Sequence, residues 1–81
     1  MQNLPAQNPI HRAIRRPQLE QATGLKRTSI YNKLNPKSPQ YDPTFPRPIN
    51  LSSRTIAWVE SEVQAWIDSR IAASRAVQGG N

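Results

Sequence analysis

A run of polar and basic side chains at residues 24–34 has the composition of a surface that reads DNA bases. Asparagine can form two hydrogen bonds with adenine, arginine can form two with guanine, and threonine can contact a base edge or a thymine methyl group. If the run is helical, with about 100° per residue, Ile30 and Leu34 share one side while Thr28 and Asn32 lie nearly opposite. One side then enters a core and the other is free to meet the major groove.

The candidate contacts divide by the part of DNA that each side chain suits. Thr28, Asn32 and Arg27 are candidates for base edges, although Arg27 lies between the two sides and could instead brace a phosphate or lie across the protein. The other side chains suit contacts with phosphates or with the edge of a groove. The alternative for each of them is an exposed residue that contacts only water. The candidate DNA-binding residues are Arg16, Arg27, Thr28, Ser29, Tyr31, Asn32, Lys33, Arg47 and Arg54, with Arg12, Arg15 and Lys37 as further possible phosphate contacts.

Local signals predict a helix-turn-helix that positions this surface. Pro17 suits a first helical position, and we expect the first helix at about Pro17–Thr23. Gly24 stands where a helix end often needs a left-handed residue, and Leu25 can fill the angle between the helices. The second helix is expected to begin near Lys26 or Arg27 and to end at about Leu34, before Asn35-Pro36.

Residues 35–48 contain five prolines, so this stretch is either an ordered loop or a tether. Tyr41 and Phe45 favour the ordered loop, because aromatic rings in a short loop usually pack on something.

A hairpin is predicted at Pro48–Trp58, preceded by a short extended segment at Ile10–Arg15. We expect the hairpin's apolar side chains to share one face, which requires a loop of two or four residues. Because Ser-Ser is a poor pair for a two-residue turn, the four-residue loop at residues 52–55 is preferred, with Arg54 at its tip. The apolar side chains are Ile49, Leu51, Ile56 and Trp58.

The last helix is expected to begin between Val59 and Glu62, with Ser61 and Gln64 as a capping box. It should fray towards Gly79-Gly80. Its apolar stripe, which can cover the other two helices, consists of Val63, Trp66, Ile67 and Ile71. The two tryptophans, Trp58 and Trp66, are expected in the core rather than as a stacking platform for bases.

Composition excludes several classes of function. The chain has 81 residues and a net charge of +6, with nine basic and two acidic side chains in residues 1–59, which suits a polyanionic partner. It has no cysteine and one histidine, His11, so we expect no metal site, no cofactor and no catalysis. The absence of a long apolar run or an apolar leader predicts a cytoplasmic, nucleoid-associated protein without a membrane segment.

The order of several motifs resembles the AlpA family of prophage regulatory proteins, over about residues 14–75. Besides Pro17 and Gly24-Leu25, the resemblance is carried by Thr28-Ser29-Ile30-Tyr31, Phe45-Pro46-Arg47-Pro48, Ile49-Asn50-Leu51 and the run from Ala57 to Ile67. It implies a mainly α fold with a small β-hairpin, a MerR-like or excisionase-like winged helix-turn-helix of three helices plus a wing. The recognition helix would be residues 26–34 and the wing would be centred on residues 52–55.

Two departures from the usual family pattern stand out. Lys26 occupies a position where serine is usual, which removes a good helix N-cap. Residues 35–44 lengthen the connection between recognition helix and wing.

We therefore expect a flexible arm at residues 1–9, a winged helix-turn-helix domain at 10–76 and a flexible tail at 77–81. The expected function is sequence-specific binding of double-stranded DNA as a transcriptional regulator of a prophage or integrated element. The alternatives are an excisionase that bends attachment-site DNA and a protein-interaction module that uses the last helix. Further expected partners are a second copy, as a homodimer or a cooperative array on DNA, and an integrase or the transcription machinery, because a single module has a small DNA footprint.

Overall fold

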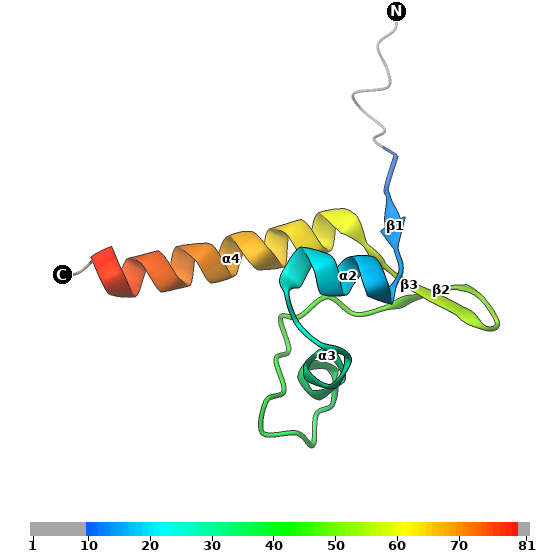
Figure 1. The fold of residues 1–81 in the computed structure, drawn as a ribbon, viewed down its shortest axis with the longest axis horizontal. Helices are drawn as coiled ribbons and strands as arrows, with labels where there is room; N and C mark the ends of the chain where they lie inside the picture. The colour runs from blue at the N-terminus through cyan, green and yellow to red at the C-terminus, as the bar shows by residue number, and fades with distance from the viewer. Residues whose placement is uncertain (1–9, 80–81) are drawn as a thin grey trace, which may run out of the picture.

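Three helices combine with a small antiparallel sheet in the computed structural model, which describes residues 10–79 (Figure 1). The hairpin projects from the body, and the first two helices form the helix-turn-helix, so the fold is the predicted winged helix-turn-helix. In chain order the elements are β1 (Ala13–Ile14), α2 (Arg16–Thr23), α3 (Arg27–Leu34), β2 (Ile49–Ser52), β3 (Thr55–Val59) and α4 (Glu60–Gly79).

Helix α2 begins one residue before the predicted Pro17 and ends where predicted. At its start the Arg15 N–H donates to Gln18 Oε1 over 2.9 Å. At its end Gly24 has a φ of 76°, and its N–H donates to the Glu20 carbonyl over 2.7 Å. A left-handed residue with this hydrogen bond is a common way to end a helix, and it turns the chain towards α3.

Helix α3 has the predicted boundaries. Lys26 is its N-cap, in an extended conformation and without a side-chain hydrogen bond to the helix. The first-turn N–H groups therefore receive no acceptor from the N-cap side chain.

Strand β3 lies at the centre of the sheet, between β1 and β2. Ile14 of β1 pairs with Trp58, which confirms an extended segment before α2. In the hairpin Ile49 pairs with Ala57 and Ser52 pairs with Thr55, with an irregularity between residues 50 and 52.

The hairpin differs from the prediction in its loop and in its apolar face. The bulge at Leu51 shortens the turn to Ser53 and Arg54, so the predicted four-residue loop is wrong. Because Ile49 opposes Ala57, it lies on the other face from Trp58. Ile49 and Leu51 are accordingly 39% and 53% exposed, and the predicted single apolar face does not form.

Helix α4 begins inside the predicted interval, and its Glu60 N–H donates over 2.7 Å to the carbonyl of Arg12, the residue before β1. The predicted capping box is wrong, since Ser61 lies within the helix and the Gln64 amide instead donates to Asp68. The helix continues through Gly79, so residues 77–79 of the predicted tail are helical. The predicted arm at residues 1–9 lies outside the described residues.

The core takes side chains from both helices of the helix-turn-helix, from the sheet, from α4 and from the connection before β2. Trp58 is fully buried, as predicted, and Trp66 packs half-buried against the core. The predicted stripe of α4 covers the core only with its first part, because Ile71 is 39% exposed and the end of α4 extends beyond the other elements (Figure 1). The buried cluster is Ile14, Leu19, Ile30, Phe45, Trp58 and Val63.

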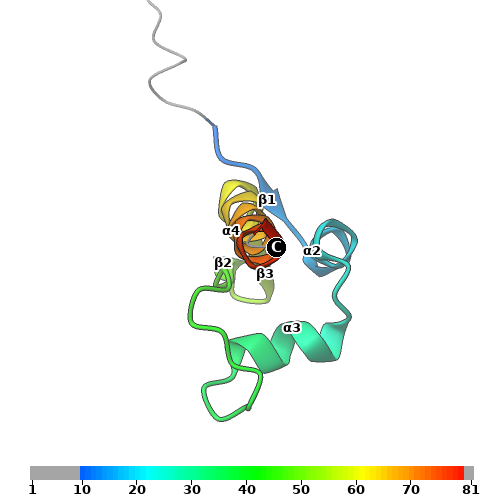
Figure 2. The same cartoon turned by 90° about the vertical axis from the view of Figure 1, so that its left-hand side faces the viewer.

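The connection between α3 and β2 is an ordered loop, the first of the two predicted alternatives. Its backbone forms successive turns, in which the Asp42 N–H donates to the Lys33 carbonyl and the Phe45 N–H donates to the Asp42 carbonyl, each over 3.0 Å. Phe45 is 2% exposed and meets the Trp66 ring edge to face at 4.9 Å between centroids. In Figure 2 this loop hangs below α3, at its C-terminal end.

Two indole N–H groups hold the second half of the loop. Trp66 Nε1 donates to Asp42 Oδ2 over 3.0 Å, and Trp58 Nε1 donates to the Pro46 carbonyl over 3.2 Å. Because one tryptophan belongs to α4 and the other to β3, the loop is attached to both elements. Among the described residues, no helix has the length and apolar character needed to cross a membrane.

Candidate nucleic-acid interface

Helix α3 lies along one edge of the molecule, with one side buried and the other open (Figure 2). Ile30 is fully buried and Leu34 is half-buried against the core. Thr28 is exposed and Asn32 is half-buried. The helical period therefore divides the side chains as predicted, although the DNA-contacting role of each one stays a prediction.

Asn32 borders a shallow hollow beside α3. The hollow has a volume of about 310 Å³ and reaches from Leu25 in the turn to Gln40 in the loop, with Ser29 and Lys33 on the helix itself. The side chains around it are mainly hydrogen-bond donors and acceptors, the groups that base edges require. Gln40 was not among the predicted contacts, because its place beside Asn32 depends on how the loop folds.

Arg27 lies along its own helix. Its guanidinium carbon is 5.9 Å from the centre of the Tyr31 ring, a cation–π arrangement. Both residues are exposed, and Tyr31 has 37% of its surface accessible. The guanidinium therefore lies at the surface of α3 and not across the protein core.

Arg16 reaches the same tyrosine from the start of α2. Its Nε lies 3.2 Å from Glu20 Oε2, and together with Tyr31 it lines a cavity of about 270 Å³ at the base of the hairpin. The Tyr31 hydroxyl, more than Glu20, holds the pKa of the Arg16 guanidinium above its ordinary value. Three predicted contacts, Arg16, Arg27 and Tyr31, thus form one group, here called the arginine–tyrosine group.

Lys33 faces the loop and α4. Its ammonium nitrogen lies 5.7 Å from the centre of the Trp66 ring. Burial acts to raise the pKa of Asp42, but hydrogen bonds from Thr44 and Trp66, with the charge of Lys33, outweigh it and hold that pKa below its usual range. Lys33 therefore contributes to holding the loop, a role that its sequence position did not indicate because Trp66 is distant along the chain.

The remaining two candidates lie outside α3 and apart from each other. Arg47 donates from Nη2 to the Tyr41 hydroxyl over 2.7 Å, and its guanidinium lies 5.9 Å from the centre of that ring. Arg54 is exposed in the turn of the hairpin, which projects away from the helices (Figure 1). The structure places Arg47 on the loop side of α3 and Arg54 on the wing.

The model of the family described as "Prophage CP4-57 regulatory protein (AlpA)" matches residues 12–71. The chain belongs to the AlpA family. The match includes both helices of the helix-turn-helix, the wing and the part of α4 that covers the core. The resemblance inferred from the sequence motifs is confirmed.

Two curated relatives of this AlpA-family chain share a large part of it. The "DNA-binding transcriptional activator AlpA" of Escherichia coli (strain K12) is 44% identical over 59 residues, which cover 73% of this chain and 84% of the relative. The "Uncharacterized protein ORF88" of Enterobacteria phage P4 is 34% identical over 61 residues, which cover 75% of this chain and 62% of the relative. No solved structure matches the chain.

Proposed function

We propose that this chain is a sequence-specific double-stranded DNA-binding protein that regulates transcription in a prophage or integrated element. The observation that carries the proposal is the open polar side of α3, which stands opposite buried Ile30 and ends in a hollow beside Asn32. Similarity to a relative named as a DNA-binding transcriptional activator supports it. Such a protein acts in the cytoplasm on DNA and needs neither a cofactor nor catalysis.

The proposed mechanism places α3 in the major groove. Asn32 and Thr28 read base edges, because they occupy the side opposite the core. The arginine–tyrosine group binds a phosphate at the edge of that groove, since the Arg27 guanidinium lies over the exposed Tyr31 ring and Arg16 borders a cavity with the same tyrosine. Ser29 supports base or phosphate contact from the flank, and Arg54 on the wing reaches the neighbouring minor groove or its phosphates.

The test is fluorescence anisotropy with duplexes that tile the DNA upstream of the gene and of its neighbours, compared with a scrambled duplex. We expect one tile to bind at least about 10³-fold tighter than the scrambled duplex. Asn32→Ala should remove most of this preference, because its amide is assigned to a base. Gln64→Ala, which removes an exposed amide from α4, is the matched control and should keep it.

Equal binding of all tiles, with an affinity that depends only on salt, would contradict the proposal. A preference that survives in Asn32→Ala would instead remove Asn32 from base reading while leaving sequence-specific binding in place.

A second candidate function, excision of the element through DNA bending, is favoured by one observation. Leu51 is 53% exposed at the bulge of the wing, two residues before the exposed turn that carries Arg54. Proteins that kink DNA from the minor groove often insert an apolar side chain between base steps. Energy transfer between dyes on the two ends of the preferred duplex would show bending, and Leu51→Ala should reduce it if the wing is the wedge.

Assembly on DNA belongs to the same proposal. A single module of this kind covers about 600–1,000 Å² of protein surface, so a homodimer or an array of adjacent copies would raise the affinity. Cooperative binding to repeats near an attachment site would favour an integrase as partner. Binding beside a promoter would favour the transcription machinery.

A further inference from the structure

We propose that the loop at residues 35–47 is a second DNA-contacting element, which binds backbone phosphates of one strand through Lys37 and Arg47. The inference rests on the proposed function, because it concerns DNA that α3 already occupies. It adds a contact on the side of α3 opposite the wing.

The loop is held in one shape. Besides the Asp42 and Pro46 attachments to the two tryptophans, the Lys37 N–H donates to Asn35 Oδ1 over 3.0 Å and the Ser38 N–H donates to the Asn35 carbonyl over 2.9 Å. A side chain on a preformed loop loses less conformational entropy on binding than one on an unstructured segment. Lys37 is therefore presented at a defined position.

The exposed charge of the loop is positive. Its one acidic side chain in the sequence, Asp42, is turned inward, where Trp66 and Thr44 donate to its two carboxylate oxygens. Lys37 and Arg47 are both exposed. A polyanion approaching this side of α3 meets these two cations without a competing free carboxylate from the loop.

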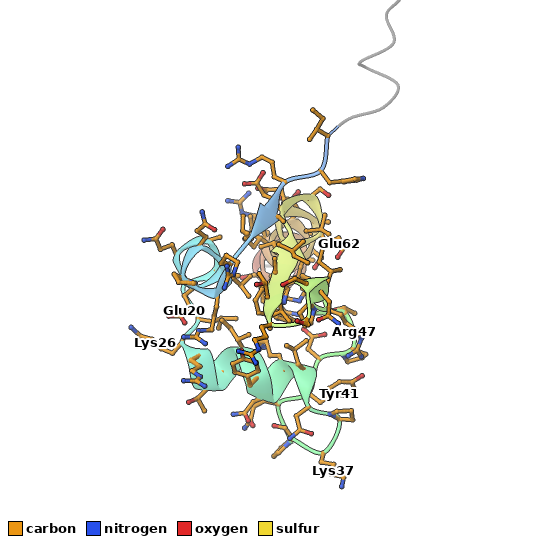
Figure 3. The ribbon with its side chains drawn as sticks, turned by 90° about the vertical axis from the view of Figure 1, so that its right-hand side faces the viewer. Glu20, Lys26, Lys37, Tyr41, Arg47 and Glu62 are labelled. Carbon is orange, nitrogen blue, oxygen red and sulfur yellow. The ribbon has the colours of Figure 1, made fainter. Side chains whose placement is uncertain are left out.

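The loop lies beside the part of α3 that faces DNA in the proposed mechanism. Gln40 borders the same hollow as Asn32, and the loop tip lies below α3 (Figure 2). Figure 3 shows Lys26 projecting near one end of α3 and Lys37 at the lowest point of the loop, near the other end. Eight helical residues span about 12 Å, which is about the width of the major groove, so cations beyond the two ends of α3 face the two opposite strands.

Arg47 is oriented and still able to bind. One of its N–H groups is used by the Tyr41 hydroxyl, and Figure 3 shows the two side chains together at the loop side of the molecule. A guanidinium has five N–H donors in a planar fork, so further donors stay free for a phosphate. Tyr41 therefore acts as a positioning residue for Arg47.

The test is the salt dependence of binding to the preferred duplex, measured by anisotropy for the full chain, Lys37→Ala, Arg47→Ala and the double variant. Each lost phosphate contact should make the negative slope of log affinity against log salt shallower by about 0.9. The preference over scrambled DNA should stay unchanged, since phosphates carry no sequence information. Arg75→Ala, with the same change of charge on exposed α4, is the control and should keep the parent slope.

Hydroxyl-radical footprinting supplies the second readout. The parent chain should protect sugars of one strand at the edge of its site. The double variant should lose this protection and keep the rest of the footprint. Circular dichroism before each titration confirms that the variants are folded. Lys37→Ala leaves the loop's hydrogen bonds in place, because the Lys37 side chain is exposed and only its backbone N–H donates to Asn35. An unchanged slope and footprint in the double variant would overturn the inference while leaving the proposed function intact. Absence of specific binding by the parent chain would instead contradict the proposed function.

Discussion

Asp42 is the side chain that joins the loop to the rest of the molecule. It lies at the start of the turn before Phe45, and it accepts hydrogen bonds from Thr44 within the loop and from Trp66 on α4. Lys33 adds a nearby positive charge. One carboxylate thus connects the end of α3, the loop and α4.

We expect Asp42→Asn to destabilise the protein by about 1 to 3 kcal/mol at neutral pH, because the amide has one acceptor oxygen in place of two. One of the two hydrogen bonds is lost, and the other becomes a weaker neutral one. Although burial opposes it, the net lowering of the pKa of Asp42 means that the folded state favours the charged carboxylate. The stabilisation is therefore present above the ordinary pKa of 3.8 and is lost as the pH falls through the lower folded value.

Urea unfolding of both proteins at pH 7 and near pH 3 measures this effect. The difference in unfolding free energy should shrink in acid. A difference that is the same at both pH values would show that the charge of Asp42 is not involved.

Gly24 is the other residue with a measurable local role. Its φ of 76° is unfavourable for a residue with a Cβ, yet beyond the two neighbouring residues no atom lies within 4 Å of where that Cβ would stand. Gly24→Ala should therefore cost only the conformational strain, about 1 to 2 kcal/mol. Gly24→Asn is the control and should cost less, because asparagine tolerates this region. Equal Tm values for Gly24→Ala and the parent would show that the left-handed conformation at residue 24 carries no cost for alanine.

At the scale of elements, burial separates the loop from the wing. Phe45 is 2% exposed and packs on Trp66, whereas Leu51 on β2 is 53% exposed. We expect Phe45→Ala to lower the unfolding free energy by about 3 to 5 kcal/mol and Leu51→Ala to change it by no more than about 0.5 kcal/mol. Urea unfolding measures both, and similar losses would show that the wing packs more tightly than its exposure indicates.

The sequence predicted those elements whose boundaries depend on neighbouring residues. Pro17, Gly24 and Asn35-Pro36 act within a turn of the helices that they delimit, so α2 and α3 were located to within one residue. The side of α3 that enters the core followed from its period, because Ile30 and Leu34 are the sole large aliphatic residues within it.

Features that depend on distant contacts could not be predicted. The hairpin register follows from a bulge at Leu51, and no sequence pattern around Leu51 marks that bulge. The spacing of the apolar residues suggested another pairing of the two strands. The order of the loop depends on Asp42 meeting Trp66, 24 positions later in the chain. The position of Gln40 beside Asn32 and the contact of Lys33 with the Trp66 ring depend on the same packing of loop and α4, so Gln40 and this second role of Lys33 were missed for the same reason.

At the scale of the whole molecule, the net charge of +6 destabilises the folded state through repulsion and favours the binding of a polyanion. The two ion pairs of the described residues are on partly or largely accessible side chains and add little stability. The main effect of added salt on folding is therefore to screen the repulsion between like charges. We expect the Tm of the free protein to rise slightly as NaCl increases.

The same salt should act in the opposite direction on the DNA complex. A bound duplex raises Tm by mass action, and that increase should fall with salt as counterion release becomes less favourable. Thermal unfolding over one NaCl series, with and without the preferred duplex, measures both trends. A free-protein Tm that falls with salt would show that attractive ion pairs outweigh the repulsion.

The two indole hydrogen bonds also affect how the protein can evolve. They hold the chain at Asp42 and Pro46, after the loop has left α3 and before it enters the wing. Residues 36–40 lie ahead of both attachment points, so insertions or deletions there leave the spacing from residue 42 to the wing unchanged. Lineages carrying this fold can therefore change the length and charge of the tip without rebuilding the core.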